Sequence, residues 1–334
     1  MTLDQRRTAT IEDVAATAGV SRAAVSKVLR NAYGVSDAMR ERVTAAMTEL
    51  DYRPRVAARA MRGRTFTIGI EIPDFGNQFF TRMLNGAMRA LAGTDYQVVI
   101  APAEEGSREG LRAIEALIDR QVDGVIAVSP RVGQEALERI ATRTPVVMFG
   151  RSDTSDEYDT VTGDDVAGAN AAITHLLELG HVRIAHLTLH ESDEAALSPH
   201  GVRLREYRAA MSRTGIDETV LWTDEGQDAA YAVVRAAIES GWTTTALFAA
   251  HDELAIGALR AVAETGSALS VVGYDDVPIA AHPGLGLTTV HQPGDLMGER
   301  AIQLLLERID GRTAPVHEVF VPDLRVRTST RPVA

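Results

Sequence analysis

The sequence predicts an α/β protein that has a small all-helical domain at its N-terminus and a larger core of two lobes, each built on a parallel sheet. Two observations lead to this prediction. Residues 10–50 repeat apolar side chains at intervals of three and four, whereas residues after 65 alternate short β-rich apolar runs with amphipathic stretches. The length of 334 residues allows two or three domains.

Charge is distributed unevenly along the chain. The net charge is −12, but residues 1–64 hold 12 Lys and Arg against 7 Asp and Glu, a balance of +5. Residues 65–334 hold 22 against 39, a balance of −17. A basic head on an acidic body directs the head toward a polyanion and holds the body away, so nucleic acid is a candidate partner of the head.

Composition and motifs argue against several classes of protein. Without cysteine the chain has no disulfides, thiol catalysis or Cys-ligated zinc. With no run of 18 uncharged apolar residues and no apolar stretch after the first seven residues, we expect a cytoplasmic protein that has no membrane partner.

An enzyme is the main alternative from another functional class, and few features of the sequence favour it. No P-loop, nucleophile elbow or strand-linked dinucleotide-binding motif occurs, so we expect no catalytic residues and no cofactor. Histidines at 175, 181, 186 and 190 lack the tight spacing of zinc ligands, so we expect no metal.

Three helices are predicted over residues 10–50. Thr10 and Ser21 are placed to cap the first two, Gly19 can take the positive φ that ends the first, and Ser36 is placed to cap the third. Apolar positions along each helix can close a small core. They are Val14, Ala15, Val20, Val25, Val28, Leu29, Met39, Val43, Ala46, Met47 and Leu50.

The stretch from Thr10 to Met61 resembles the DNA-binding head of the lactose-repressor (LacI) family of bacterial transcription regulators. The matching residues are Asp13-Val14-Ala15, Ala18-Gly19-Val20-Ser21, Val25-Ser26-Lys27-Val28-Leu29, Val35-Ser36, Arg40, Val43, Leu50, Tyr52 and Pro54, in unbroken register. The resemblance implies a helix-turn-helix domain over residues 1–53 that places its second helix in the major groove of double-stranded DNA.

Individual residues of the head have distinct expected roles. Arg22, Ala23 and Lys27 occupy the family's base-reading positions: the two cations can donate to guanine, and the alanine can contact a thymine methyl. A second group is assigned to phosphates, which position the protein without specifying sequence. This group is Thr10, Ser21, Asn31 and Tyr52. The alternative is a solvated basic helix without a nucleic-acid partner.

Residues 54–64 form a short segment of strong helix formers and arginines that is too short to hold a helix alone in water. The resemblance implies a hinge helix that orders on DNA. Met61, where the family usually has leucine, would then be a wedge in the minor groove, and Arg59 a further DNA-binding residue. A plain linker is the alternative. Arg55 stands where the family commonly has asparagine and offers an extra phosphate contact.

Strands are predicted in the core at residues 66–72, 96–100, 122–128, 146–149, 183–189, 245–249 and 269–273, with further strand-like stretches at 316–321 and 325–328. Their alternation with helices predicts βαβ units. About 270 residues are more than a single sheet and its hydrophobic core usually contain, so we expect two lobes. A ligand should bind at the carboxyl ends of their strands.

The core, residues 65–334, resembles the family's effector-binding core, which is itself similar to periplasmic sugar-binding proteins. Matches include Pro73-Asp74, Asn77-Gln78-Phe79-Phe80, Leu179-Gly180-His181 and residues 122–126, 252–258, 271–276 and 287–290. The resemblance implies two Rossmann-like lobes. Lobe 1 would take residues 65–162 and 292–321, and lobe 2 residues 163–291 and 322–330.

The resemblance also gives a set of candidate effector-binding residues. Phe79 and Phe80 would offer aromatic faces to the ligand, with core packing as the alternative for each. Arg203 could fork onto hydroxyls or a carboxylate, with a structural charge as the alternative. The complete set is Asp74, Asn77, Phe79, Phe80, Arg203, His251, Asp275 and Gln292.

His251 departs from the family, which usually has asparagine before Asp252. An imidazole offers different hydrogen bonds according to its tautomer and charge. Two consequences stay open: the effector carries an anionic group, or the pocket hydrogen-bonds through a neutral ring.

Together these features predict a ligand-responsive transcription regulator. We expect a homodimer on a palindromic operator, released by a small sugar-like effector. We do not expect a tetramerising coiled coil, because no heptad segment follows the last strand-like stretch. A corepressor such as a nucleobase would use the same coupling in the opposite direction. A free-standing cytosolic sugar-binding protein is the other rival class.

Overall fold

The computed structural model describes residues 9–29, 33–52, 63–103, 110–190 and 197–333. The chain divides into two compact units, Met1–Thr65 and Phe66–Ala334. Asn31, Arg59 and Met61, all expected to contact DNA, lie outside the described residues, as does most of the expected hinge.

The first unit contains the three predicted helices, α1 (Ile11–Thr17), α2 (Arg22–Leu29) and α3 (Asp37–Glu49). The Thr10 hydroxyl accepts a hydrogen bond from the Asp13 N–H at 3.3 Å, and the Asp13 carboxylate accepts one from the Thr10 N–H at 2.8 Å. This reciprocal arrangement satisfies two amides that the start of a helix leaves without partners.

The other expected helix signals of this unit are also confirmed. The Ser21 hydroxyl accepts from the Ala24 N–H at 3.1 Å, so it caps α2, and Ser36 caps α3 through its hydroxyl. Gly19 has φ +63°, which turns the chain between α1 and α2. Val14, Val25 and Val43, one from each helix, are fully buried against one another.

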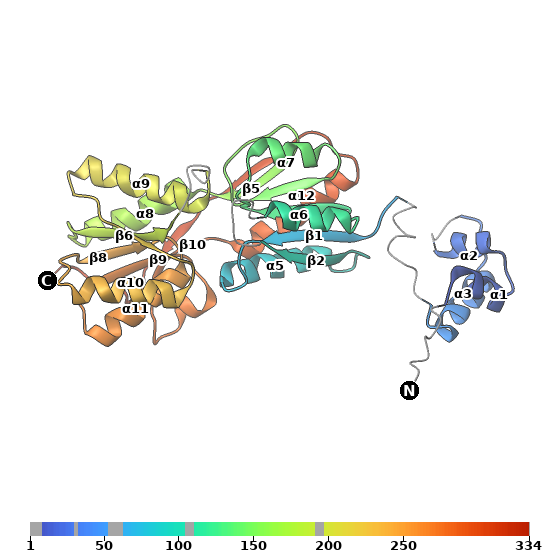
Figure 1. Cartoon of the computed structure of the whole chain (residues 1–334), viewed down its shortest axis with the longest axis horizontal. Helices are drawn as coiled ribbons and strands as arrows, with labels where there is room; N and C mark the ends of the chain where they lie inside the picture. The colour runs from blue at the N-terminus through green and yellow to red at the C-terminus, as the bar shows by residue number, and fades with distance from the viewer. Residues whose placement is uncertain (1–8, 30–32, 53–62, 104–109, 191–196, 334) are drawn as a thin grey trace. The chain divides into compact units, whose positions relative to one another are not determined.

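The first sheet of the core has six parallel strands in the order β11-β5-β4-β3-β1-β2 (Figure 1). They are β1 (Thr67–Ile72), β2 (Gln97–Pro102), β3 (Gly124–Val128), β4 (Val146–Phe149), β5 (Asp159–Gly163) and β11 (His317–Phe320). Helices α5 (Gln78–Leu91) and α12 (Gly294–Ile309) cover one face, and α6 (Leu111–Asp119) and α7 (Gln134–Ala141) cover the other.

The second sheet has the order β12-β10-β9-β8-β6-β7 and is parallel except for β12. Its strands are β6 (Ile184–Leu189), β7 (Val220–Thr223), β8 (Ala246–Ala249), β9 (Ser270–Asp275), β10 (Thr288–His291) and β12 (Asp323–Arg325). Helices α8 (Asp165–Glu178) and α9 (Pro199–Thr214) cover one face, and α10 (Gln227–Glu239) and α11 (Asp252–Thr265) cover the other. The short 3₁₀ helix η2 (Pro278–Ala281) follows β9.

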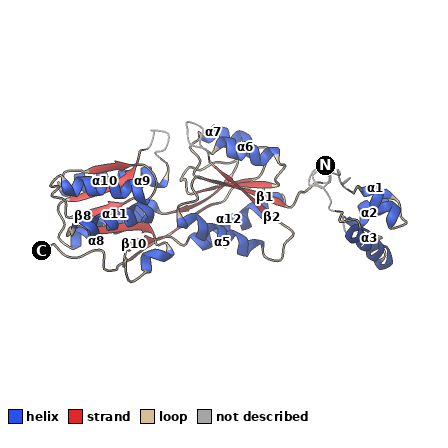
Figure 2. Ribbon diagram, turned by 60° about the horizontal axis from the view of Figure 1, so that its bottom comes forward, coloured by secondary structure: helices blue, strands red, loops and turns tan. Residues whose placement is uncertain are grey.

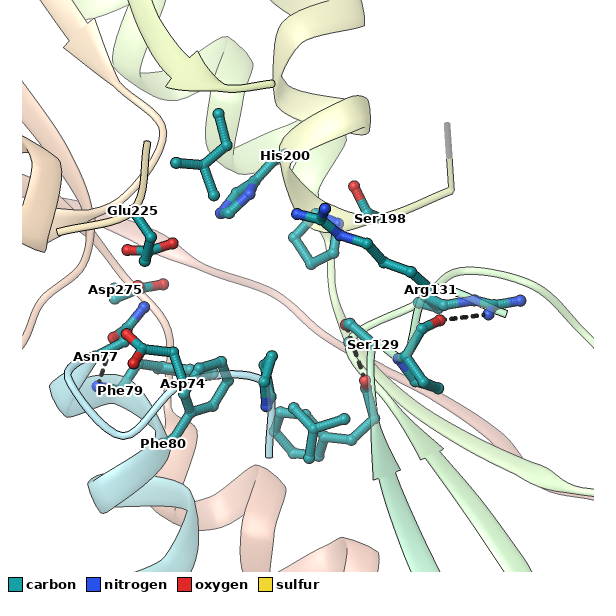
Figure 3. Close-up of a pocket in the computed structure, with 18 of the residues that line it drawn as sticks. Asp74, Asn77, Phe79, Phe80, Ser129, Arg131, Ser198, His200, Glu225 and Asp275 are labelled. Carbon is teal, nitrogen blue, oxygen red and sulfur yellow. Dashed lines mark hydrogen bonds between the residues drawn. The ribbon is translucent and has the colours of Figure 1, made fainter. Parts of the chain in front are cut away.

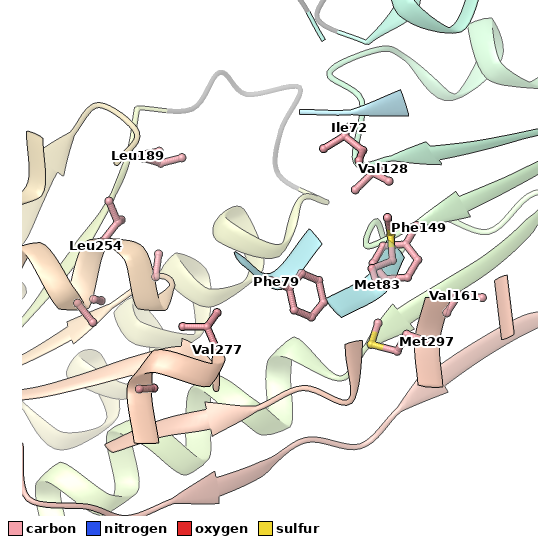
Figure 4. Close-up of a cluster of buried hydrophobic side chains, with 14 of the residues drawn as sticks. Ile72, Phe79, Met83, Val128, Phe149, Val161, Leu189, Leu254, Val277 and Met297 are labelled. Carbon is pink, nitrogen blue, oxygen red and sulfur yellow. The ribbon is translucent and has the colours of Figure 1, made fainter. Parts of the chain in front are cut away.

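Helices lie on both faces of each sheet (Figure 2), the arrangement typical of parallel sheets. In β3, Ile126 and Val128 pack toward α5 and α12, while Val125 and Ala127 pack toward α6 and α7. The same alternation occurs in the second sheet. One apolar cluster includes side chains from both lobes, with Phe79 and Met297 on one side and Leu254 and Val277 on the other (Figure 4).

Three crossings connect the two sheets, after β5, after β10 and after β11. All seven core strands predicted from apolar runs are present, with ends shifted by up to two residues. The stretch at 316–321 contains β11, whereas the final strand is β12 at Asp323–Arg325 rather than 325–328. Within the described residues, no helix is long and apolar enough to span a membrane.

Candidate functional sites

Helix α2 presents different side chains on its two sides. Val25 and Val28 are buried in the core of the head, whereas Arg22, Ala23 and Lys27 are exposed. The three expected base-reading residues therefore lie on the surface of the head, at the capped start and the middle of α2. Backbone amides at a capped helix start can also bind phosphate oxygens.

Arg22 has a partner within the head. Its Nη1 atom lies 3.0 Å from Oε1 of Glu12 on α1, and both side chains are mostly exposed. An exposed ion pair of this kind contributes little, about 0–1 kcal/mol, so the guanidinium remains available to exchange Glu12 for a base edge.

Three further residues expected to contact DNA lie within the described part of the chain, and each has structural contacts of its own. Thr10 and Ser21 cap their helices, and the backbone N–H of Tyr52 donates to the Met47 carbonyl at 2.9 Å. The Tyr52 side chain is half-buried against the apolar core of the head.

A cavity of about 670 Å³ lies between the two lobes of the core. Its walls come from the carboxyl ends of strands in both sheets, because residues just after β1, β3, β4, β6 and β7 and the last residue of β9 line it. Ligands of open parallel sheets bind at this edge. Figure 3 shows Asp74, Asn77, Glu225 and Asp275 at one end of this cavity and Arg131, Ser129 and Ser198 at the other.

Seven of the eight expected effector-binding residues line this cavity, and His251 is not among the lining residues. The lobe-1 wall contains Asp74, Asn77, Phe79 and Phe80 at the start of α5. The Asn77 side-chain oxygen accepts from the Phe79 N–H at 2.9 Å and so caps α5. This bond leaves the amide nitrogen of Asn77 as the group that can donate to a ligand.

The two phenylalanines differ in their surroundings. Phe79 is only 6% exposed, and its ring packs against Phe149 and close to the backbone of Gly294, so most of it belongs to the core. Phe80 is half-buried and meets Phe79 edge to face at 5.9 Å between ring centroids. Phe80 therefore has more surface to offer a ligand.

Arg203 is fixed by several interactions at once. Nε and Nη2 lie 2.8 and 2.7 Å from one oxygen of Asp165, and Nη1 donates to the Ala250 carbonyl at 2.6 Å. The guanidinium also covers the ring of Tyr274 at 3.5 Å. Burial by itself lowers the pKa of Arg203, but Asp165 outweighs it and raises that pKa above its usual value. Arg203 therefore carries a permanent charge in a fixed position.

Asp275 ends β9 and is 3% exposed. Its Oδ1 accepts a hydrogen bond of 2.7 Å from Nε2 of Gln292, which follows β10 on a crossing segment. Burial raises the pKa of Asp275, and the positive charge of Arg203 opposes this rise. The neighbouring Asp252 is not among the residues that line the cavity. It accepts from the Val277 N–H at 2.8 Å and from the Thr289 hydroxyl at 2.6 Å.

His251 lies behind the cavity wall. It is 1% exposed, and its Nε2 atom is 3.1 Å from Oε1 of Glu225, a residue that does line the cavity. The ring stacks on His200 at 5.2 Å between centroids. His251 is the residue before α11 but makes no side-chain capping bond.

Gln78 and Arg82 of α5 form hydrogen bonds to the second lobe. The Gln78 side-chain amide, at the start of α5, donates to Oε1 of Glu253 on α11 at 3.3 Å. Arg82 Nη1 donates to the Asp276 carbonyl at 2.9 Å. Contacts of this kind change when two lobes close or open around a ligand.

Several lining residues had not been expected from the sequence. Glu225 follows β7, a strand of four residues that was not predicted, so its position at a strand end was not recognised. Ser129 and Arg131 follow the predicted strand β3, and their position after a strand was a signal that could have identified them. His200 comes from the first turn of α9.

Within the described residues, no group of three or more His, Asp or Glu side chains is arranged to hold a metal ion. The four histidines considered as metal ligands have separate roles. His175 contacts the Thr330 hydroxyl, His181 contacts Thr245, His186 bonds to the Phe248 carbonyl, and His190 stacks on Trp222.

Comparison with known families gives two matches along the chain. Residues 10–55 match the model of "Bacterial regulatory proteins, lacI family", and residues 173–330 match that of a periplasmic binding protein-like domain. The ribose operon repressor of Escherichia coli (strain K12) is 31% identical over 312 residues, which cover 90% of this chain and 93% of that protein.

Solved structures with the same fold include two regulators. The structure of a transcriptional regulator CelR-cellobiose complex is 31% identical, with a TM-score of 0.69, and covers 96% of this chain and 100% of that chain. The structure of the lac repressor dimer bound to operator and the anti-inducer ONPF is 26% identical, with a TM-score of 0.79, and covers 97% and 100%. Both similarities extend over the head and the core.

Proposed function

The chain belongs to the lacI family of bacterial regulatory proteins, a family of ligand-responsive DNA-binding transcription regulators and not of enzymes, and from this membership we propose how its own residues act. It binds a palindromic operator as a homodimer and leaves the operator when a small sugar-like molecule enters the cleft of the core. The proposed location is the cytoplasm, where the operator would be.

The observation that carries this proposal is the pairing of two features in one chain. The exposed Arg22, Ala23 and Lys27 of α2 can read base edges. The cleft of about 670 Å³ has the size and the mixed aromatic and polar lining of a small-molecule site. One relative is named for the ribose operon, and another is in complex with cellobiose, which supports a carbohydrate effector.

In the proposed mechanism the effector binds in the cleft between the two lobes. Lobe 1 takes residues 65–162 and 292–321, and lobe 2 takes residues 163–291 and 322–330. A ligand that contacts Asp74 and Asn77 in one lobe and Asp275 in the other favours one relative position of the lobes. It can shift the equilibrium only by its difference in affinity for the two positions. A coupling of about 3 kcal/mol changes operator affinity roughly 150-fold.

Operator selection and ligand screening test this proposal together. The full chain is mixed with random duplex DNA, bound sequences are recovered, and a panel of sugars and nucleobases is screened for a rise in melting temperature. We expect recovery of an inverted repeat and at least one stabilising sugar. If no preferred sequence is recovered, the proposed binding to a specific operator is wrong. If only nucleobases raise the melting temperature, the effector is a nucleobase and not a sugar.

A further inference from the structure

Two histidines and a glutamate from three separate segments meet at the lobe-2 wall of the cleft. Glu225 follows β7, His251 precedes α11, and His200 lies in the first turn of α9. The Nε2 of His251 is 3.1 Å from Oε1 of Glu225, and the rings of His251 and His200 stack at an interplanar angle of 25°. Figure 3 shows His200 and Glu225 beside each other at the cavity, close to Asp275.

Of the two residues in this ion pair, Glu225 lines the cavity and His251 does not. The Glu225 side chain keeps 36% of its surface exposed and lines the cavity, whereas the His251 side chain keeps 1%. An effect of His251 on a ligand therefore passes through its neighbours that line the cavity, Glu225 in the ion pair and His200 in the ring stack.

The charge of His251 depends on all groups that face it. Burial lowers the pKa of His251, but Glu225, aided by Asp275, outweighs burial and the repulsion of Arg203 and holds that pKa above its usual value. Burial likewise acts against the charge of Glu225, yet His251, with help from His200, lowers the pKa of Glu225 to about 2. The raised pKa of His251 favours the imidazolium and the lowered pKa of Glu225 favours the carboxylate, so each residue of the pair stabilises the charge of the other.

We propose that His251 is a positioning residue that holds Glu225 as a charged acceptor in the cleft, so that this end of the site takes hydroxyl or ammonium groups of the effector and rejects anionic groups. The inference rests on the proposed function, because it concerns the ligand of the same cleft. It differs from both meanings that the replacement of an asparagine by His251 left open: the histidine does not attract an anion, and it acts on Glu225 as a charged ring and not as a neutral one.

The remaining charges at this end agree with the inference. Asp74, Asp224 and Asp275 also line the cavity, whereas the guanidinium of Arg203 is neutralised by Asp165. An anionic group placed here would face several carboxylates, and like charges at short distance in a poorly hydrated site repel strongly. A hydroxyl or ammonium group would instead donate to them.

A double-mutant cycle on the full chain tests the inference. The variants are His251→Asn, Glu225→Gln and the double variant, with His282→Asn on an exposed loop as the matched control. Asparagine is among the best residues to precede a helix, so His251→Asn preserves α11. The probes are D-ribose and cellobiose, with ribose 5-phosphate and cellobionate as their anionic counterparts, and binding is measured by calorimetry.

We expect a neutral sugar to bind at least about tenfold more tightly than its anionic counterpart, and each single variant to weaken the neutral sugar about tenfold. The double variant should be no weaker than either single variant, because both residues act through one contact. Affinity of the parent chain should fall as pH rises through the pKa of His251, and His251→Asn should remove this dependence. His282→Asn should change none of these values.

The outcomes separate the inference from the proposed function. If the anionic probes bind more tightly, or if His251→Asn binds the neutral sugar as the parent does with the same pH profile, the inference is wrong while the effector cleft stands. If none of the four probes binds although the operator does, the proposed sugar effector is wrong and the inference falls with it.

Discussion

Nε2 of Gln292 donates a hydrogen bond of 2.7 Å to Oδ1 of Asp275, and this bond joins a crossing between the lobes to the carboxyl end of β9. Asp275 has a φ of +107°, which few residues other than glycine adopt without strain. Strain of this kind persists where surrounding contacts enforce it, and it is common at ligand sites. A ligand bound to Asp275 therefore acts on a carboxylate that is already connected to the segment between the lobes.

Asp275→Asn should weaken effector binding about 10-fold to 100-fold, because an amide replaces the charged acceptor. The free energy of unfolding should not fall by more than about 1 kcal/mol, since asparagine tolerates positive φ and removes a buried charge. Calorimetric titration and denaturant unfolding check the two values. The matched control is Asp276→Asn, which loses bonds to Arg327 and His291 but does not line the cavity. The assignment of Asp275 fails if the control weakens binding as much.

Arg203→Ala should lower the free energy of unfolding by about 3–5 kcal/mol, because it leaves the Asp165 carboxylate buried without its cation. Urea unfolding of the parent and the variant measures this loss. Arg205→Ala, two residues along α9, breaks an exposed pair with Glu206 and should cost less than about 1 kcal/mol. Equal losses in the two variants would contradict the structural role of Arg203.

Arg22→Ala should weaken binding to the selected operator by about 1–3 kcal/mol and relax preference at one base position of each half-site. Glu12→Gln, which removes the partner of Arg22 within the head, should leave that preference intact. Competition binding against operators substituted at each position measures both. If Arg22→Ala weakens binding to all sequences equally, Arg22 contacts a phosphate and not a base.

His186 predicts a dependence of stability on pH. It is fully buried between Tyr207 and Phe248, and burial lowers its pKa to about 3. In the unfolded chain its pKa is about 6.5, so between these values the unfolded state binds more protons and stability falls as pH falls. The loss reaches about 1.4 kcal/mol for each pH unit well inside this window.

His186→Phe separates this contribution from that of other groups, since phenylalanine has no titrating nitrogen. As the pH is lowered from about 7 to 4, the free energy of unfolding of the parent should fall more than that of the variant. A difference that stays constant over this range would show that the His186 ring is not excluded from protonation.

The sequence predicted well those parts of the fold whose signal is local. The caps at Thr10, Ser21 and Ser36 and the apolar runs of the longer strands each lie within a few adjacent residues. Strands β5, β7 and β10 were not predicted, because their apolar side chains are interrupted or bounded by Asp, Thr, Gly or His and form no continuous apolar run of strand length. Tertiary pairing with neighbouring strands, and not local propensity, stabilises these three.

The residues of the cleft were predicted only where they lie next to a strand that has a local sequence signal. Asp74 and Asp275 follow predicted strands, so the general rule for parallel sheets located them. The ion pair between Glu225 and His251 could not be predicted, because its members are 26 positions apart and meet only when β7 and β8 take places on either side of β6. No spacing within the sequence encodes that neighbourhood.

The most direct test of the account is the affinity of the full chain for its selected operator, measured by fluorescence anisotropy with and without a sugar that calorimetry shows to bind the core. The account predicts sequence-selective binding that weakens with salt and changes by about 10-fold to 150-fold at saturating sugar. An operator affinity that is the same at every concentration of the bound sugar would contradict it.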